Sequence, residues 1–381
     1  MTLATEAPFE VAFLDKLQNL LAEGDFTATY KFAVLLGLVE LSVETATGTD
    51  TFTTRHLAEK VVELYWPQAL SYEGVELRQN PHRQARILSA VAGFRAEAAR
   101  AGLAAAPLMA VARRFDERWR KLLDEVEWSL IEMPLPRLQR LPSGSDEFLY
   151  QLAWTLEDVL ERRASIHREV RAHQRGQGDA FDNRIQMRPG AVSALARFHG
   201  IVRDLVEVRW VRKVHDLNGL TLGERDLHAH LFGLERAQLV ALRGPLRELH
   251  GGRCFYCDGR LVEGDIDHFL PWARYPENRL ENLVPTHARC NQSKSAHLAA
   301  VEHLDHWLKR FVTRRNDLAE VSRAARWPTG GLATLSISRL LYAQQPEESR
   351  LWFARDDFRP WHHAEVHKRI AAAIEQLQSV A

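Results

Sequence analysis

The chain of 381 residues has few cysteines, no excess charge of either sign and no long apolar run. Its longest apolar stretch, residues 32–39, is far shorter than the roughly 20 apolar residues that cross a bilayer, so no membrane-spanning segment is expected. The N-terminus carries acidic residues and no basic segment, so a secretory signal is not expected either. The length and the ordinary globular composition together predict two or three domains, and the cytoplasm is the expected location.

Charge is balanced overall, with 50 lysines and arginines against 50 aspartates and glutamates. This balance excludes the strongly basic composition of a histone-like binder, so a nucleic-acid site has to come from a local patch or a metal site. One local surplus of arginine occurs in residues 78–121, where aromatic side chains are interleaved. Two interpretations stay open: helices that contact phosphates, or a solvated face paired with acids elsewhere, such as Asp124, Glu125 and Glu127.

All three cysteines lie within one short stretch, residues 254–294. Cys254 and Cys257 have the spacing of a zinc knuckle, and His287 and Cys290 follow with the same spacing. Three thiolates and one imidazole in two such pairs suit a closed, tetrahedral, structural zinc site. The sequence therefore predicts these four residues as ligands of a structural Zn²⁺, which fits a reducing cytoplasm.

Two alternatives accompany the zinc interpretation. The Cys-x-x-Cys pair could be a redox pair, which would need no distant partners and would begin a helix in a strand–helix–strand unit. Within the zinc interpretation, His250 and His297 are substitutes for His287 as the fourth ligand.

A second pattern is interleaved with the first. Asp267, His268 and Asn282 lie between the two halves of the zinc pattern, and Asn291 follows directly after Cys290. The order His-x13-Asn-x8-Asn, with a knuckle-like pair on each side, resembles the HNH endonuclease family, the ββα-metal nucleases. The resemblance covers roughly residues 248–312, and it is specific because six or seven positions must agree in order.

The resemblance implies a fold and a set of roles for these residues. Asp267 and His268 would close the first strand, Asn282 would begin the second, and a helix would run from His287 through residue 298. His268 would be the general base that activates water, and Asn282 would orient the loop that carries it. Asp267 and Asn291 would hold the catalytic cation; because both offer oxygen, Mg²⁺ or Mn²⁺ suits them better than Zn²⁺.

The helix that carries Asn291 departs from the family pattern at two positions. Asn291 stands where many members have histidine, and Ser295 stands where some have a further metal-binding histidine. On a continuous helix, Asn291, Lys294 and Ser295 would share one face. Lys294 and Arg289 are candidates for contacts with substrate phosphates. The helix is expected to continue through residues 295–315.

The rest of the chain predicts a mainly α fold. Four regions are expected: a helical domain in residues 1–135, a second, mostly helical region in 136–247, the nuclease module in 248–312 and a helical extension in 313–381. The proline-rich stretch 133–146 is expected as the linker at the first boundary, and the polar, glycine-rich stretch 174–189 as a loop.

The leading functional hypothesis is therefore a metal-dependent HNH endonuclease that hydrolyses phosphodiester bonds, with double-stranded DNA as the expected substrate. By analogy alone, such a protein would serve phage defence or restriction, with the helical regions recruiting a protein partner or a second copy of the chain. RNA or a DNA–RNA hybrid is a variant of this hypothesis, although the sequence has no RRM or KH signature. The alternative function is a non-catalytic nucleic-acid- or partner-binding protein with a structural zinc module.

Overall fold

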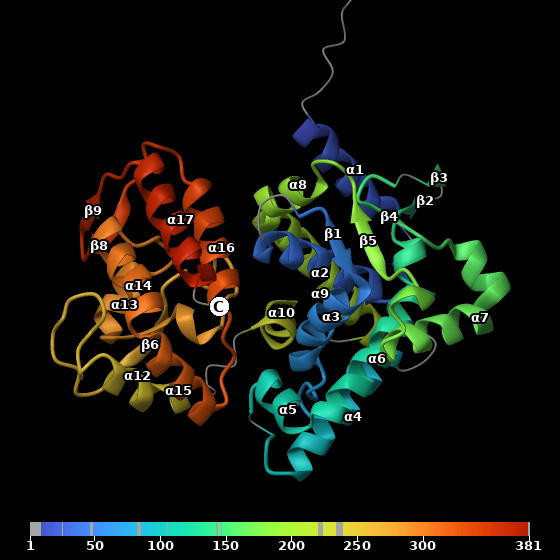
Figure 1. Cartoon of the computed structure of the whole chain (residues 1–381), viewed down its shortest axis with the longest axis horizontal. Coiled ribbons are helices and arrows are strands. Elements are labelled where there is room, and N and C mark those ends of the chain that lie inside the picture. The colour runs from blue at the N-terminus through green and yellow to red at the C-terminus, as the bar shows by residue number, and fades with distance from the viewer. Residues whose placement is uncertain are drawn as a thin grey trace, which may run out of the picture. The chain divides into compact units, whose positions relative to one another are not determined.

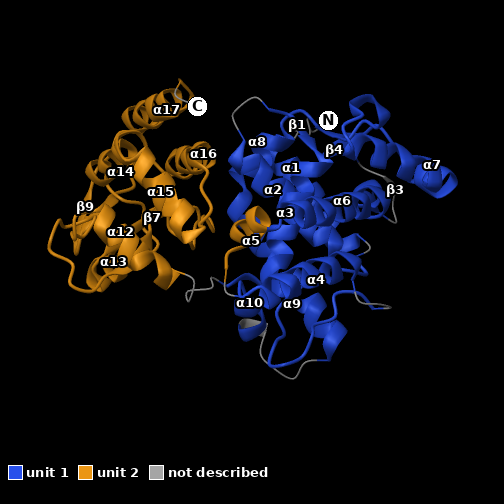
Figure 2. Cartoon of the chain, turned by 60° about the horizontal axis from the view of Figure 1, so that its bottom comes forward, with its two compact units in different colours: residues 1–104, 115–234 blue, residues 105–114, 235–381 orange. Residues whose placement is uncertain are grey.

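The computed structural model describes residues 9–24, 26–45, 49–81, 85–104, 106–141, 144–145, 147–219, 224–233 and 239–379. Helices make up most of these residues and the strands are short, which confirms the predicted mainly α fold class (Figure 1). The chain forms two compact units (Figure 2): unit 1 comprises residues 1–104 and 115–234, and unit 2 comprises residues 105–114 and 235–381. The division into four regions expected from the sequence stays a prediction.

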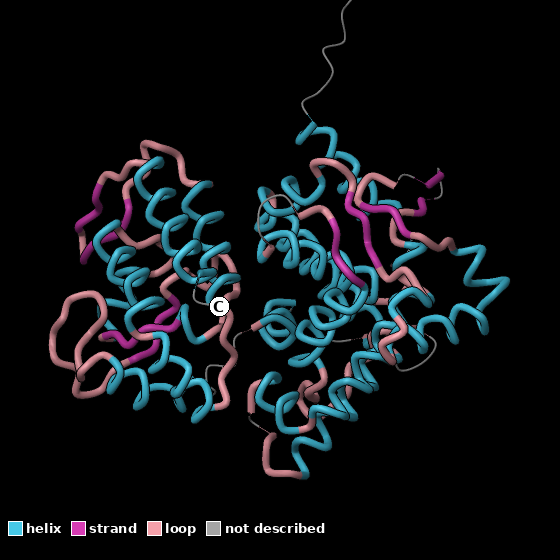
Figure 3. The backbone as a smooth tube through the Cα atoms, viewed as in Figure 1, coloured by secondary structure: helices cyan, strands magenta, loops and turns pink. Residues whose placement is uncertain are grey.

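Unit 1 is built from helices around a small antiparallel sheet (Figure 3). Its helices are α1 (Phe9–Glu23), α2 (Tyr30–Glu44), α3 (Thr54–Gln68), α4 (Arg86–Arg100), α6 (Asp116–Glu132), α7 (Leu156–Gln174), α8 (Ala191–Arg197), α9 (His199–Asn218) and α10 (Glu224–Phe232). Its strands are β1 (Thr51–Thr53), β2 (Arg140–Leu141), β3 (Gly144–Ser145), β4 (Tyr150–Leu152) and β5 (Arg184–Met187). Helix α2 is the centre of this unit: it is buried from Phe32 through Val43 and contacts α3, α8 and α9, as its all-round apolar sequence predicts.

Two stretches of unit 1 differ from the sequence expectation. The expected loop 174–189 contains β5, which pairs with both β1 and β4 in the order β1-β5-β4. The expected linker 133–146 begins with packed residues: Leu135 and Leu138 are buried, and the side chain of Gln139 bonds the backbone of Leu149 and Tyr150. Strand pairing in the first stretch and side-chain packing in the second therefore give structure to residues whose composition is typical of loops.

Four basic residues of the arginine-rich stretch 78–121 are paired with acids. Arg86 contacts Glu132 at 2.6 Å, and Lys121 contacts Glu117 at 2.6 Å. Further ion pairs join Arg118 to Glu97 and Arg120 to Asp116. These pairs support the interpretation of a solvated, internally compensated face over that of a phosphate-binding surface.

Unit 2 contains the stretch with the cysteines. Its helices are α5 (Leu108–Arg114), α12 (Arg243–Leu249), α13 (Ala288–Lys294), α14 (Val301–Thr313), α15 (Arg315–Ala325), α16 (Gly331–Ala343) and α17 (His363–Ser379). Its strands are β6 (Asp265–His268), β7 (Leu283–Thr286), β8 (Leu351–Ala354) and β9 (Asp357–Arg359). Strands β6 and β7 form an antiparallel hairpin in which Asp267 pairs with Val284 and His268 with Leu283, and α13 follows directly. The hairpin and the helix give the expected ββα order.

The helix after the hairpin is shorter than expected. Helix α13 ends at Lys294 because Ser295 adopts a left-handed backbone angle, with φ of 48°, and the next helix begins only at Val301. The expectation of one continuous helix from residue 287 through 315 is therefore wrong. Ser295 lies beyond the end of α13 and is exposed, so it does not share a helical face with Asn291 and Lys294.

The C-terminal residues complete the core of unit 2. The backbone of Trp352 in β8 bonds Leu298 and Ala300, the two segments running as a parallel bridge. The rings of Tyr256 and Trp352 lie 5.1 Å apart, and both residues are buried. Residues beyond 312 are thus part of the same packed body as the hairpin.

Candidate functional site

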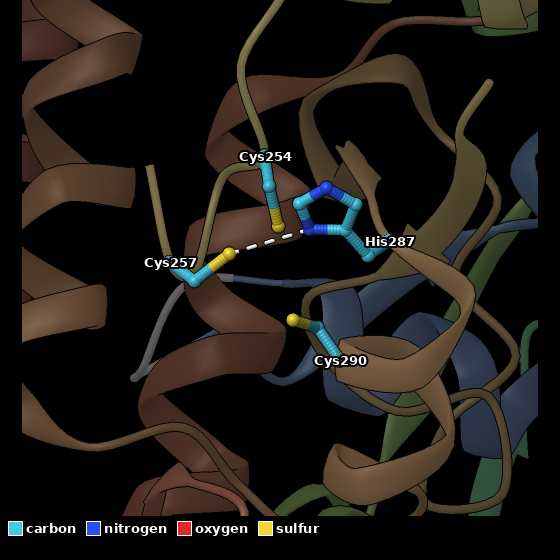
Figure 4. Close-up of side chains that lie close together, drawn as sticks. All are labelled: Cys254, Cys257, His287 and Cys290. Carbon is cyan, nitrogen blue, oxygen red and sulfur yellow. Dashed lines mark hydrogen bonds between the residues drawn. The ribbon is translucent and has the colours of Figure 1, made fainter. Parts of the chain in front are cut away.

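The predicted zinc ligands come together at one end of the hairpin. Cys254, Cys257, His287 and Cys290 each offer one ligand atom, and these atoms all lie within 4.8 Å of one another. Figure 4 shows the three sulfur atoms and the His287 ring converging on one point. The cluster is consistent with a zinc clip, as expected.

The backbone prepares this convergence. The amide of Cys254 donates to the carbonyl of Gly259 at 2.9 Å, and the amide of Asp258 donates to the carbonyl of Cys254 at 3.0 Å, which closes a tight turn. Asp258 adopts a φ of 54°, a left-handed conformation that short polar side chains tolerate. At Gly259 a Cβ atom would lie 3.2 Å from the His287 ring, so the absence of a side chain keeps the turn close to the imidazole.

His287 is oriented for ligation through one nitrogen. Its Nε2 donates to the carbonyl of Arg260 at 3.1 Å, while Nδ1 lies 3.3 Å from the Cys257 sulfur. A bond from one imidazole nitrogen to a carbonyl fixes the tautomer and leaves the other nitrogen for the metal. The two proposed substitutes lie elsewhere: Nε2 of His250 contacts Arg310 at 3.3 Å, and the ring of His297 packs against Phe358.

The donor set fits Zn²⁺ electrostatically as well. Burial, together with the negative charges of Cys254 and Cys257, raises the pKa of Cys290 to about 12. Burial alone would raise the pKa of Cys254. Hydrogen bonds, led by those from the backbone amides of Cys257 and His287, instead lower the pKa of Cys254 to about 6. Three sulfurs in such proximity concentrate negative charge, which a divalent cation bound by the four groups would neutralise.

Asp267, near the end of β6, takes part in a buried network. Its Oδ2 accepts from the Tyr256 hydroxyl at 2.5 Å and lies 2.9 Å from the Lys294 ammonium. The same ammonium donates to the carbonyl of His268 at 2.8 Å. Lys294 therefore ties the two consecutive residues Asp267 and His268 to helix α13.

The burial of Lys294 corrects one expectation. Its side chain is 0% exposed, and burial lowers its pKa below the ordinary 10.5 although Asp267 opposes that shift. A phosphate cannot contact an ammonium that is enclosed in this way and already bonded to a carboxylate and a carbonyl. Lys294 therefore does not make the expected phosphate contact; it stabilises the fold by bonding Asp267 and the carbonyl of His268. Arg289, one of the exposed residues of α13, is accessible to solvent.

His268, the last residue of β6, is largely enclosed. The residue is 6% exposed, and its ring lies 5.3 Å from that of Trp272. Its Nε2 lies 3.2 Å from Oδ1 of Asn278. Burial lowers the pKa of His268 below the ordinary 6.5, although the bond to Asn278 opposes the shift. The imidazole is consequently neutral at pH 7.

Asn282 is fully buried and bonds the loop that follows His268. Its Oδ1 accepts from the amide of Leu270 at 2.7 Å, and its Nδ2 donates to the carbonyls of Leu270 at 3.1 Å and Glu277 at 2.9 Å. The backbone adds a bond from the amide of Phe269 to the carbonyl of Asn282 at 2.8 Å. Both ends of the loop are thereby fixed to the start of β7.

Asn291 lies on α13, one helical turn before Lys294. Residues three apart on a helix are neighbours on one face, so Asn291 is on the side of α13 from which Lys294 reaches Asp267. Asn291 is half-buried, whereas Lys294 is enclosed. The expected role of its amide oxygen as a second cation ligand beside Asp267 stays a prediction.

Comparison with known proteins agrees with this geometry. Residues 255–300 match the HNH endonuclease family. The resemblance inferred from Asp267, His268, Asn282 and Asn291 is thus confirmed for this stretch, which we call the HNH segment. The chain is also 28% identical over 115 residues to protein ea31 of Escherichia phage lambda. That match covers 30% of this chain and 36% of the phage protein, and no solved structure matches the chain.

Several residues at the site carry no signal in the sequence. Tyr256 lies between the first two cysteines, Asn278 lies in the loop after β6, and Trp327 lies 27 positions beyond the HNH segment. Their importance follows from contacts with Asp267, with His268 and with the loop after His268, which only the folded chain shows. Among the helices described, each is too short or too polar to cross a membrane.

Proposed function

We propose that the protein is a metal-dependent HNH endonuclease that hydrolyses phosphodiester bonds in DNA. The observation that carries the proposal is the placement of Asp267 and His268 at the end of one strand of a ββα unit, within the residues that match the HNH endonuclease family. Asn282 fixes the loop beside them, and Asn291 lies on the helix that bonds Asp267 through Lys294.

Asp267 and Asn291 are the proposed ligands of the catalytic cation. Their oxygen atoms suit Mg²⁺ or Mn²⁺, which prefer few protein ligands and leave positions for water and phosphate oxygens. The Tyr256 hydroxyl and the Lys294 ammonium both contact Oδ2 of Asp267, so Oδ1 is the oxygen proposed to face the cation. When bound, the cation would stabilise the negative charge that develops on the phosphate and on the leaving oxygen.

His268 is the proposed general base. Its enclosure keeps the imidazole neutral at pH 7, and a neutral imidazole can take a proton from water. The water oxygen forms a bond to phosphorus, the bond from phosphorus to the leaving oxygen breaks, and the water proton passes to His268. A positioned base of this kind contributes roughly 10²- to 10⁴-fold to the rate.

The zinc clip is proposed to be structural and separate from this chemistry. A unit as small as one hairpin and one short helix has too little core to fold alone. A Zn²⁺ held by Cys254, Cys257, His287 and Cys290 would join the turn before the hairpin to the start of α13. That link would set the position of the helix that carries Asn291 and Lys294.

The proposal extends to the substrate and to the biological setting. Arg289 is exposed on α13 and is the proposed phosphate contact. Double-stranded DNA is the proposed substrate, cleaved in the cytoplasm during phage defence or restriction. Unit 1, whose arginines are largely paired, would recruit a protein partner or a second copy of the chain more readily than bind DNA tightly.

A nicking assay tests the proposal. Purified, zinc-replete protein is incubated with supercoiled, linear, modified and single-stranded DNA, and with RNA, in the presence of Mg²⁺ or Mn²⁺ and in parallel with EDTA. Cleavage of DNA that requires the added cation supports the proposal, and cleavage of RNA alone would change the substrate. Binding without cleavage under every condition would support the alternative of a non-catalytic binding protein.

A further inference from the structure

The hydrogen bond between His268 and Asn278 determines which nitrogen of the imidazole can act. Nε2 of His268 lies 3.2 Å from Oδ1 of Asn278. A carboxamide oxygen only accepts hydrogen bonds, so Nε2 must carry the proton of the neutral ring. Nδ1 is then the nitrogen with the free lone pair, and it is the atom that can accept a proton from water.

Asn278 is itself held by residues far along the chain. Nε1 of Trp327 donates to the carbonyl of Asn278 at 2.8 Å, and Trp327 is only 2% exposed. The amide of Leu280 donates to the carbonyl of Pro328 at 2.9 Å. The amide of Gly330 donates to the Glu281 carboxylate at 3.2 Å. Residues 327–330 therefore bond residues 278–281 at three points.

This second segment lies outside the HNH segment, which ends at residue 300. It connects α15 to α16, so its position depends on the packing of the C-terminal helices. The His268 ring is enclosed and its Nε2 points towards Asn278, while Nδ1 has no hydrogen-bond partner among the residues that the structure describes.

We propose that Asn278 is a positioning residue that holds His268 in the tautomer with Nδ1 unprotonated, and that Trp327 keeps Asn278 in place for this purpose. The proposal rests on the proposed function for its catalytic consequence, and it adds two residues, one of them outside the HNH segment, to the machinery of the base. It also gives the C-terminal helices a direct role in orienting the catalytic side chain.

The first test replaces the acceptor. Asn278→Leu removes the oxygen at a half-buried position and keeps a similar volume, whereas Asn278→Asp restores an acceptor in the same place. We expect Asn278→Leu to lower kcat roughly 10- to 100-fold with KM and zinc content little changed, since a misplaced base loses much of its roughly 10²- to 10⁴-fold contribution. We expect Asn278→Asp to retain most of the activity at alkaline pH.

A direct readout of the tautomer accompanies the kinetics. In ¹⁵N-histidine NMR spectra, with His268 assigned by comparison with His268→Gln, the wild-type ring should show a protonated Nε2 and an unprotonated Nδ1. In Asn278→Leu the signals should shift towards a mixture of tautomers, and in Asn278→Asp they should keep the wild-type pattern. An unchanged tautomer in Asn278→Leu would overturn the proposal.

The second test addresses Trp327. Trp327→Phe removes the Nε1 donor but keeps an aromatic ring in the core, and we expect a decrease in kcat and a tautomer shift in the same direction as Asn278→Leu, but smaller. Trp361→Phe is the matched control, because Trp361 is also buried and its Nε1 has no hydrogen-bond partner in the part of the chain that the structure describes. Equal effects of the two substitutions would remove Trp327 from the proposal.

The two kinds of measurement separate this inference from the proposed function. If no nucleic acid is cleaved but the tautomer follows the pattern above, the positioning by Asn278 holds and the nuclease function fails. If cleavage depends on His268 but neither substitution alters the tautomer or kcat, the nuclease function holds and the positioning role is refuted.

Discussion

Replacing Lys294 by methionine should destabilise unit 2 strongly. The ammonium is 0% exposed, lies 2.9 Å from Oδ2 of Asp267 and donates to the carbonyl of His268 at 2.8 Å. Methionine keeps an unbranched apolar stem, one atom shorter than that of lysine, but leaves the buried carboxylate with the Tyr256 hydroxyl and without its cation. Removing one partner of a buried ion pair destabilises a protein by about 3–5 kcal/mol, because the remaining charge is uncompensated.

The free energy of unfolding is measured by urea denaturation of the zinc-replete full chain, followed by tryptophan fluorescence. Arg289→Met is the matched control, since Arg289 is exposed on the same helix; its effect should stay within about 0.5 kcal/mol. Adding Asp267→Asn to Lys294→Met should recover part of the loss, because both buried charges are then absent. Equal free energies of unfolding for Lys294→Met and Arg289→Met would refute the reasoning.

Three further predictions follow from the zinc clip, the loop after His268 and the half-buried His250. Cys257→Ser should release zinc and abolish activity by unfolding the module, whereas His297→Ala should keep the wild-type zinc content in metal analysis. Asn282→Ala should lower activity and retain zinc, since its three side-chain bonds to Leu270 and Glu277 are lost; normal kcat in this variant would contradict a role in fixing the loop. Burial, together with the charges of Arg310 and its neighbours, lowers the pKa of His250 to about 3, so the unfolded chain binds this proton more tightly than the folded one. Stability should therefore fall by about 2 kcal/mol between pH 7 and pH 5, and a His250→Gln variant that falls equally in urea titrations would contradict this origin.

The zinc ligands and the family resemblance could be predicted from the sequence because both are carried by spacing. Cys254 and Cys257, and likewise His287 and Cys290, are separated by two residues, and a turn or a helix start brings such residues to one point. The spacing alone did not show which of His287, His250 and His297 is the fourth zinc ligand. The structure shows only His287 in the cluster, because its Nε2 bond to Arg260 turns Nδ1 towards Cys257.

Features that depend on tertiary contacts were missed. Lys294 is a buried partner of Asp267 and not the expected phosphate contact. Helical periodicity predicts the face of the helix on which Lys294 lies, but it does not predict how deeply the side chain is buried. The early end of α13 depends on the left-handed φ of Ser295, which has no strong sequence signal in a serine. The bond from Trp327 to Asn278 spans 49 positions and has no motif at all.

The fold class was predictable because the helices of unit 1 carry clear apolar periodicity, and α2 is apolar on every side. The central strand β5 was not, since it has only two apolar residues, Ile185 and Met187, in a polar and glycine-rich stretch. Its assignment depends on pairing with β1 and β4, whose paired residues are at least 131 and 33 positions away in sequence, as in the pairs Thr53–Arg184 and Leu152–Ile185. Pairing over such separations is a property of the folded chain.

The most direct test of the account compares DNA cleavage by the wild-type protein and His268→Ala at equal zinc content, with Mg²⁺ or Mn²⁺ present. The account predicts that the wild type cleaves and that the variant loses roughly 10²-fold or more of the rate while its zinc content stays unchanged. Cleavage at the wild-type rate by His268→Ala would contradict the assignment of the base. A wild-type protein that leaves every polynucleotide intact with either cation would contradict the proposed function itself.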